Sequence, residues 1–407
     1  MSSETVIIGG GAAGMLCAAL AAERGCRVTL LEPNRVLGKK LRITGKGRCN
    51  VTNHCSVQEV MRNIPGDGKF LYSALGKLSP DDAMAMFEEM GVPLKTERGN
   101  RVFPVSDRAG DVAGALERRM HRAGVRVIHS AAKQILTQDG AVIAVETAEG
   151  RIACQAAVLC TGGLSYPGTG STGAGFRMAR ELGHTVTPLR PSLVPLTSPA
   201  PWCAQMQGLS LRNVTLSAYD GDGALLYREL GEMLFTHFGV SGPLVLSASA
   251  HMRGLDVSRC RLEIDLKPGL DEAKLDARLL RDLEKYRNRE MRNALDELLP
   301  RAMIPVVLDL AEIPAQQQAN AVTRPQRRAL LSTLKAFPVP LSGTRSIDEA
   351  IVTAGGVSLS EVNPRTMQSK LVQGLFFAGE ILDLDAYTGG FNLQIAWSTA
   401  WVAAHSL

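Results

Sequence analysis

The sequence has 407 residues, of which 45% are hydrophobic and 21% are charged, with a formal net charge of +5. This length indicates more than one domain, and the composition excludes a disordered or fibrous chain. Because no run approaches the roughly 18 apolar residues that span a bilayer, and the first strand begins without a basic leader, we expect a cytoplasmic protein with no membrane partner.

Residues 5–32 predict a strand, a helix and a second strand. Val6-Ile7-Ile8 is a short apolar run, Ala12 to Arg24 is rich in strong helix formers, and Val28 to Leu31 is again strand-like. Strands that alternate with helices predict an α/β fold in which helices cover a parallel sheet. The later members of this series are a helix over 111–124 and strands over 125–129, 142–147 and 156–159.

A glycine-rich turn links the first strand to the first helix. In its pattern, Gly9-x-Gly11-x-x-Gly14, the first glycine permits the tight turn, the second lets a pyrophosphate approach the backbone, and the third lets helix and strand pack closely. Glu32 ends the second strand, where a carboxylate can accept hydrogen bonds from the ribose hydroxyls and disfavours NADP at this site. These features together predict a dinucleotide site.

A second match to this pattern, Gly168-x-Gly170-x-x-Gly173, lacks the same context. Pro167 precedes it, no strand leads into it, and no acid ends a following strand. We therefore interpret it as a loop that starts a helix near Gly175.

The character of the sequence changes near residue 186, where prolines mark an irregular crossover. Residues 214–219 and 225–230 flank Asp220-Gly221-Asp222-Gly223, which is a hairpin signal. With a further strand expected over 261–266, residues 190–268 predict an antiparallel, β-rich region.

Helical periodicity follows the β-rich region. Apolar residues recur at spacings of three to five from Leu275 to Leu298, which predicts an amphipathic helix or helix pair ended by Pro300. Another helix is expected from Pro325 through Leu334. A strand is then expected over 347–359.

The C-terminus distinguishes FAD from NAD. Gly379-Glu380 follows an expected strand over 375–378, and Gly389-Gly390-Phe391-Asn392 opens a last helix expected over about 392–404. In FAD enzymes of this type a late Gly-Glu pair reaches the ribityl chain and phosphate, and the next helix directs its positive end at the flavin pyrimidine. Since these elements have no sheet of their own, we expect them to complete the N-terminal one.

Several sequence blocks extend this pattern over almost the whole length. They are VIIGGGAAG (6–14), LGKK (37–40), TGKGRCNVTN (44–53), TGGLSYP (161–167), FTHFGVSGP (235–243) and TAGGV (353–357), with the two C-terminal segments above. On these blocks the chain resembles the bacterial NAD(P)/FAD-dependent oxidoreductases that include 3-dehydro-bile acid Δ4,6-reductase-like, aminoacetone oxidase-like and ribosomal RNA dihydrouridine synthase flavoproteins.

The resemblance implies a two-dinucleotide-binding-type FAD Rossmann domain with an inserted β-barrel-like domain and a helical domain. Placed on this sequence, the FAD domain comprises residues 1–189 and 346–407. The β-rich substrate domain comprises 190–269 and 338–345, and the helical insertion comprises 270–337.

The residues expected to bind FAD lie in the glycine-rich turn, the basic segment, the strand ends and the C-terminal segments. Arg35 to Arg48 carries six cations and no acid, and we interpret it as a loop that neutralises the pyrophosphate and borders the flavin, with a solvated surface loop as the alternative. The full predicted set is Gly9, Gly11, Ala13, Gly14, Glu32, Lys39, Lys40, Gly45, Arg48, Cys49, Asn50, Ala132, Thr161, Gly162, Gly379, Glu380, Asn392 and Leu393.

Three residues are candidates for catalysis: Cys49, His237 and Tyr387. Cys49 is a flavin-facing proton donor or a structural thiol. A flavin-linked disulfide with Cys55 is a further alternative, although five residues separate the pair where disulfide reductases have four. His237 lies between apolar residues, so a structural histidine is its alternative. The eight cysteines form no CxxC pair, so we expect neither a metal site nor a disulfide framework.

We expect an enzyme that uses FAD and takes electrons from NAD(P)H to reduce an electron-poor C=C bond, with a uridine of 23S ribosomal RNA as one substrate. The RNA hypothesis depends on the resemblance and on the cations of the helical insertion. They are Arg324, Arg327, Arg328 and Lys335, preceded by Arg278, Arg281, Lys285, Arg287, Arg289 and Arg292. Alternatives are a small-molecule reductase or oxidase, of steroid enone or aminoketone type, and an RNA-binding assembly factor with structural FAD.

Overall fold

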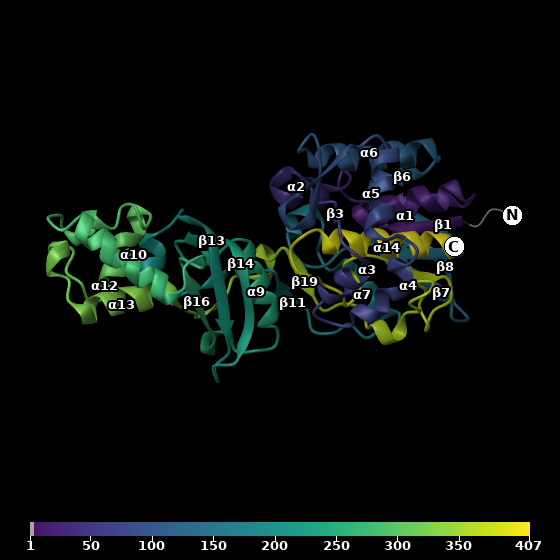
Figure 1. The fold of residues 1–407 in the computed structure, drawn as a ribbon. Helices are drawn as coiled ribbons and strands as arrows, with labels where there is room; N and C mark the ends of the chain where they lie inside the picture. The colour runs from purple at the N-terminus through teal and green to yellow at the C-terminus, as the bar shows by residue number, and fades with distance from the viewer. Residues whose placement is uncertain (1–3) are drawn as a thin grey trace. The chain divides into compact units, whose positions relative to one another are not determined.

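The computed structural model describes residues 4–407, and its contacts divide the chain into two compact units. Unit 1 comprises Met1–Ser192 and Ile347–Leu407, and unit 2 comprises Leu193–Ser346. Both ends of the chain therefore build unit 1, where the purple and yellow ribbons lie together in Figure 1.

A five-stranded parallel sheet forms the centre of unit 1. Its order is β20 (Leu375–Phe377), β10 (Ala156–Leu159), β1 (Glu4–Ile8), β2 (Arg27–Leu31) and β6 (Arg126–Ile128). The middle strands are almost fully buried, because helix α1 (Ala12–Glu23) packs against β1 and β2 and strand β8 (Ala141–Thr147) packs against β10. This confirms the predicted parallel α/β sheet and the expectation that the C-terminal strand joins it.

Three helices cover this sheet: α1 (Ala12–Glu23), α6 (Ala109–Arg122) and α14 (Phe391–His405). Helix α1 packs against both α6 and α14. Most side chains of α1 and α14 are buried, which is why both sequences are apolar all round rather than striped.

The segment predicted as a basic loop is partly helical, so that prediction is corrected. Helix α2 (Lys39–Gly47) begins after Gly38, which has a φ of 62°, and buries Leu41. The helical path is interrupted over Thr44, Gly45 and Lys46. The cations obscured this helix because a single buried leucine carries its apolar contact.

Unit 1 also contains two small three-stranded sheets. One comprises β3 (Thr52–Asn53), β5 (Arg101–Pro104) and β4 (Leu94–Glu97), and the other β7 (Ala132–Gln138), β8 (Ala141–Thr147) and β9 (Gly150–Ala153). Of these strands only β8 was predicted. The helices α3 (Val57–Arg62), α4 (Tyr72–Leu75) and α5 (Pro80–Glu89) were not predicted either. The strand expected over 347–359 is only three residues long, β19 (Val352–Ala354), and it pairs with β11 (Arg190–Ser192). Helix α7 (Ala174–Glu181) follows the second glycine pattern, as predicted.

Unit 2 contains a seven-stranded antiparallel sheet. Strands β13 (Ser210–Tyr219) and β14 (Leu225–Thr236) form the predicted hairpin, in which Asp220 Oδ1 accepts hydrogen bonds from the amides of Asp222 and Ala224. The sheet order is β17 (Phe337–Pro340), β16 (Arg261–Asp265), β13, β14, β15 (Gly239–Ser241), β12 (Leu196–Thr197) and β18 (Gly343–Thr344). No ladder joins β17 to β18 within residues 4–407, so backbone pairing leaves an open sheet where a barrel-like one was expected.

The helices of unit 2 cluster after β16, at the labels α10, α12 and α13 in Figure 1. The leucine-rich run is divided into α10 (Glu272–Lys285) and α11 (Met291–Ala294), which matches the predicted pair. Helix α13 (Arg324–Lys335) has Thr323 as its cap and Pro325 in its first turn, as expected. Helices α8 (Pro201–Gln205), α9 (Pro243–His251) and α12 (Ile304–Leu310) were not predicted.

Candidate cofactor site

The glycine-rich turn of unit 1 has three glycines with three different surroundings. A Cβ at Gly14 would lie 1.8 Å from the carbonyl oxygen of Gly9, and one at Gly9 would lie 2.5 Å from that of Cys160. A Cβ at Gly11 would meet no atom within 4 Å. Two glycines are therefore required by packing, whereas Gly11 borders open space at the first turn of α1, where unpaired amides favour an anion.

Glu32 shapes this turn. Its Oε2 accepts a hydrogen bond from the Gly10 amide at 2.8 Å, and its Oε1 accepts from the amide and the side chain of Asn34 at 2.9 and 2.7 Å. His129 Nδ1 lies 2.8 Å from the carbonyl oxygen of Asn34, and Ala132 begins β7 shortly afterwards. The structure thus brings Glu32, the glycine turn and the segment before Ala132 together at the carboxyl end of the sheet.

Two polar atoms of the predicted set are buried without a partner. Thr161 Oγ1 and Asn50 Oδ1 form no hydrogen bond within residues 4–407. A buried polar atom in this state costs free energy unless water or a ligand supplies its partner, and Thr5 Oγ1, Trp202 Nε1 and Thr236 Oγ1, outside the predicted set, share this state. Together with the open space at Gly11, Thr161 Oγ1 and Asn50 Oδ1 fit a large polar cofactor such as FAD.

The C-terminal segment contacts the glycine turn directly. Gly379 has a φ of 78°, and its Cβ would lie 3.0 Å from that of Ala13. Gly390 has a φ of 101°, and its Cβ would lie 2.4 Å from the carbonyl of Thr52. Only glycine permits both conformations and both approaches, so these glycines position α14, whose first turn contains Asn392 and Leu393.

The 44–53 block is held against α14 by buried hydrogen bonds. Thr52 Oγ1 donates to Gln394 Oε1 at 2.6 Å, and Trp397 Nε1 donates to the carbonyl of Val51 at 2.9 Å. Asn53 Nδ2 donates to the carbonyl of Gly389 at 3.0 Å. Two blocks more than 300 positions apart in the chain therefore form one wall of the site.

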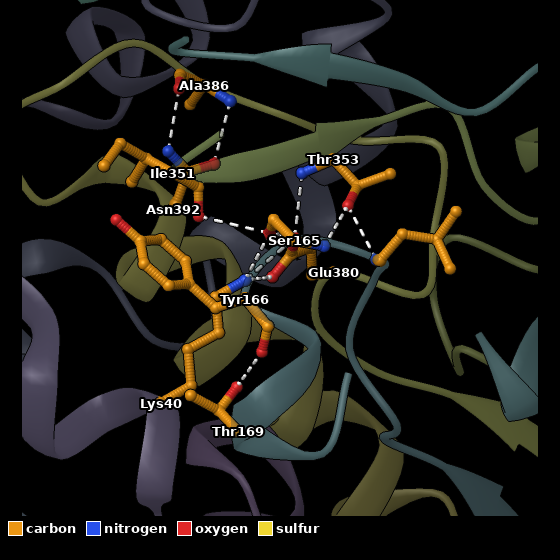
Figure 2. A network of polar contacts seen from close by, with 10 residues as sticks. Lys40, Ser165, Tyr166, Thr169, Ile351, Thr353, Glu380, Ala386 and Asn392 are labelled. Carbon is orange, nitrogen blue, oxygen red and sulfur yellow. Dashed lines mark hydrogen bonds and ion pairs between the residues drawn. The ribbon is translucent and has the colours of Figure 1, made fainter. Parts of the chain in front are cut away.

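A polar cluster of four side chains, the Lys40 cluster, joins α2 to three strand ends, as Figure 2 shows. Lys40 Nζ lies 2.8 Å from Glu380 Oε2 and 2.7 Å from Ser165 Oγ. Thr353 donates its amide to Glu380 Oε1 at 2.9 Å, and its Oγ1 accepts from the amides of Leu164 and Ser165. The cluster connects the segments after β10 and β20, which the sequence placed at the flavin.

Sequence reasoning assigned no role to Ser165 and Thr353 of this cluster. Both belong to blocks that carry the family resemblance, but 188 positions separate them. The Ser165 amide reaches Thr353 Oγ1 only because the fold places β19 beside the segment that follows β10. No local spacing could have indicated the contact.

Other predicted site residues use their side chains within the protein. Arg48 Nη2 lies 2.5 Å from Glu97 Oε1 and 2.6 Å from Asp107 Oδ1, and its guanidinium lies over the ring of Phe103. The hydrogen bond from Arg48 lowers the pKa of Glu97. Asn392 exchanges hydrogen bonds with the backbone of Ala386, as Figure 2 shows. Lys39 is exposed, and Gly45 takes a φ of 56°.

Cys49 is fully buried and has a φ of 61°. Burial raises the pKa of its thiol to about 12, so the group is neutral at physiological pH. Cys55 is a separate free thiol, half-buried, and burial raises its pKa to about 11. These properties favour the structural thiol among the three alternatives for Cys49.

We expect alkylation of Cys49 at pH 8 to be about tenfold slower than that of Cys55, because thiolate is the reactive form and Cys49 is both less ionised and less accessible. Mass spectrometry of iodoacetamide-treated protein measures both rates. Urea-unfolded protein, in which the two rates converge, is the control. Labelling of Cys49 as fast as that of Cys55 in folded protein would support a thiol that faces the flavin.

The other two catalytic candidates lie in different units. Tyr387 is half-buried in unit 1, between Glu380 and α14, and its amide donates to the carbonyl of Asn63. Burial, with Asp385 adding to the effect, raises the pKa of Tyr387, so its phenol keeps its proton at neutral pH. His237 is exposed in unit 2, in the turn between β14 and β15, beside the ring of Phe238.

Two classes of site are absent from the described residues. Residues 4–407 contain no group of three or more His, Cys, Asp or Glu side chains that could hold a metal ion. Within the same range, every helix is too short or too polar to cross a membrane.

Comparison with known proteins agrees with this geometry. A family model described as the HI0933-like protein Rossmann domain matches residues 3–406. The chain is 32% identical over 404 residues to the ribosomal RNA dihydrouridine synthase of Escherichia coli K12, covering 99% of this chain and 98% of the relative. It is 30% identical over 405 residues to the 3-dehydro-bile acid delta(4,6)-reductase of Clostridium scindens, covering 98% of each.

Solved structures show the same fold at low identity. The 3-ketosteroid delta1-dehydrogenase of Sterolibacterium denitrificans aligns with a TM-score of 0.53 at 11% identity, over 99% of each chain. An open flavocytochrome c3 fumarate reductase aligns with a TM-score of 0.50 at 15% identity, over 100% of this chain and 78% of that one. Because the family model and two relatives match nearly the full length, this protein belongs to the HI0933-like family of FAD-dependent oxidoreductases.

Proposed function

We propose that the protein reduces the C5=C6 bond of a uracil base in ribosomal RNA to dihydrouridine, with NAD(P)H as the electron donor. The observation that carries this proposal is the end-to-end similarity to the Escherichia coli enzyme of that name. A Haemophilus influenzae relative with the same name is 29% identical over 412 residues. The substrate must leave its base stack to be reduced, as in other enzymes that act on nucleobases.

FAD, when bound, supplies hydride transfer from NAD(P)H to an electron-poor alkene. The reaction consumes NAD(P)H and one proton, adds hydride to C6 and a proton to C5, and releases NAD(P)⁺. In this chain Gly11 and the first turn of α1 would hold the pyrophosphate, and Glu32 the ribose. Thr161 and Asn50 would donate or accept hydrogen bonds through the side chains that lack partners.

The decisive assay supplies purified protein and NADH or NADPH to 23S ribosomal RNA that lacks the modification. We expect a uridine to gain two mass units in a nuclease digest examined by mass spectrometry. A reaction with protein from which FAD has been removed is the control. If neither naked RNA nor ribosome assembly intermediates gain dihydrouridine, while a steroid enone is reduced, the RNA assignment is wrong.

A small-molecule enone reductase is the second candidate, favoured by the 30% identity to the bile acid reductase. The two substrates share one chemical feature, since C5=C6 of uracil is conjugated to a carbonyl like the alkene of an enone. The same flavin site could therefore serve either. Both candidates use the same reductant and cofactor. The assay above therefore separates them by which substrate is reduced, ribosomal RNA or the steroid enone.

A further inference from the structure

The cations of the α10–α13 region fall into two groups that the sequence does not distinguish. Most form ion pairs inside unit 2. Arg327 Nε lies 2.8 Å from Asp276 Oδ1, and Lys335 Nζ lies 2.5 Å from Asp265 Oδ2 and also donates to the carbonyl of Leu270. The remaining pairs are Lys274–Asp271, Arg278–Asp282, Lys285–Glu297, Arg287–Glu284, Arg292–Glu290 and Arg301–Asp296.

Four arginines form the second group: Arg281, Arg289, Arg324 and Arg328. All four are exposed, and within residues 4–407 none has a carboxylate at ion-pairing distance. Arg289 lies against the ring of Tyr286, 4.7 Å from its centroid. We refer to these residues as the four-arginine surface.

Backbone contacts join the segment of Arg289 to the turn that precedes α13. The carbonyl oxygens of Arg287 and Arg289 accept hydrogen bonds from the amides of Asn320 and Ala319. This turn leads directly into α13, where Arg324 and Arg328 are four residues apart and so share a face. The turn after α10 and the start of α13 thus bring Arg289, Arg324 and Arg328 into one region, and Arg281 lies within α10.

We infer that the four-arginine surface binds the phosphate backbone of RNA. The inference rests on the proposed function for the class of partner, and on the structure for the residues. Exposed guanidinium groups without carboxylate partners repel one another, and an anionic ligand removes that cost. Guanidinium also matches phosphate geometry with paired donors. Arg327 and Lys335, by contrast, hold α13 against α10 and β16 and are structural.

The test compares two double variants that remove the same charge from the same region. R324Q/R328Q removes unpaired arginines, and R287Q/R292Q removes exposed arginines already paired with Glu284 and Glu290. The probe is a 23S ribosomal RNA transcript, titrated by filter binding at several salt concentrations. FAD content and the thermal unfolding midpoint show that each variant is folded.

We expect R324Q/R328Q to weaken RNA binding about tenfold and to lower the slope of log Kd against log salt by about two, one for each lost phosphate contact. R287Q/R292Q should match the wild type. The inference that this surface binds RNA is wrong if both variants weaken binding equally or if neither does. It is also wrong if the wild type binds no RNA. Binding is measured without turnover, so the two proposals can fail separately. A chain that binds RNA through these arginines but forms no dihydrouridine refutes the proposed reaction and supports the RNA-binding surface.

Discussion

Replacing Gly11 by Val is expected to abolish FAD binding and to leave the folded chain otherwise unchanged. A side chain at this position meets no protein atom within 4 Å, and Gly11 has a φ of −81°, which any residue adopts. The valine would instead occupy the space in front of the first turn of α1, where the pyrophosphate would lie. Flavin absorbance per mole of purified protein measures the loss.

Gly14→Val is the matched control for this substitution. Its Cβ would lie 1.8 Å from the backbone oxygen of Gly9, so we expect it to destabilise the turn itself. The FAD-free Gly11→Val protein should unfold within about 1 °C of FAD-free wild type, whereas Gly14→Val should unfold many degrees lower. Full flavin content in Gly11→Val would show that the cofactor does not approach this turn.

Glu380→Leu is expected to lower the free energy of unfolding by about 2 kcal/mol, because it leaves the Lys40 ammonium without its carboxylate and the Thr353 amide without its acceptor. The side chains of Lys40 and Glu380 are only 22% and 20% exposed, so water replaces the lost partner poorly. We also expect FAD to dissociate faster, since the Lys40 cluster orders the segments that would face it. Urea denaturation of FAD-free protein and the recovery of flavin fluorescence on dilution measure the two effects.

The Arg119–Glu23 pair provides the comparison for the Lys40 cluster. Its distance is similar, at 2.7 Å, but Glu23 is 39% exposed, and the pair joins the C-terminal ends of α1 and α6. Glu23→Leu should cost less than about 1 kcal/mol and should not change FAD release. A Lys40→Met/Glu380→Leu double variant should be more stable than the sum of its single variants predicts. If Glu380→Leu changes the free energy of unfolding and FAD release no more than Glu23→Leu does, the Lys40 cluster does not order the cofactor site.

The sequence alone predicted the elements whose characteristic residues lie close together in the chain. The turn from Gly9 to Gly14 follows from one strand, one helix and three glycines within ten residues, and the hairpin at Asp220 to Gly223 follows from its turn residues. The last strand and helix were placed in the N-terminal sheet because they had no other sheet to join. For the turn and the hairpin the deciding interaction lies within a few residues, whereas the last strand was placed by elimination and pairs with the distant β10 (Ala157 opposite Leu375).

Only the tertiary structure shows which charged and polar groups pair with one another inside the protein. Arg324, Arg327 and Arg328 are equivalent in the sequence, yet only Arg327 meets an acid, Asp276, 51 positions away. Lys40 is one of six cations in its sequence segment, and only the fold places it beside Glu380, 340 positions away. Ion pairs depend on distances of a few ångströms that packing sets, whereas sequence spacing specifies only the nearest turns of a helix or strand.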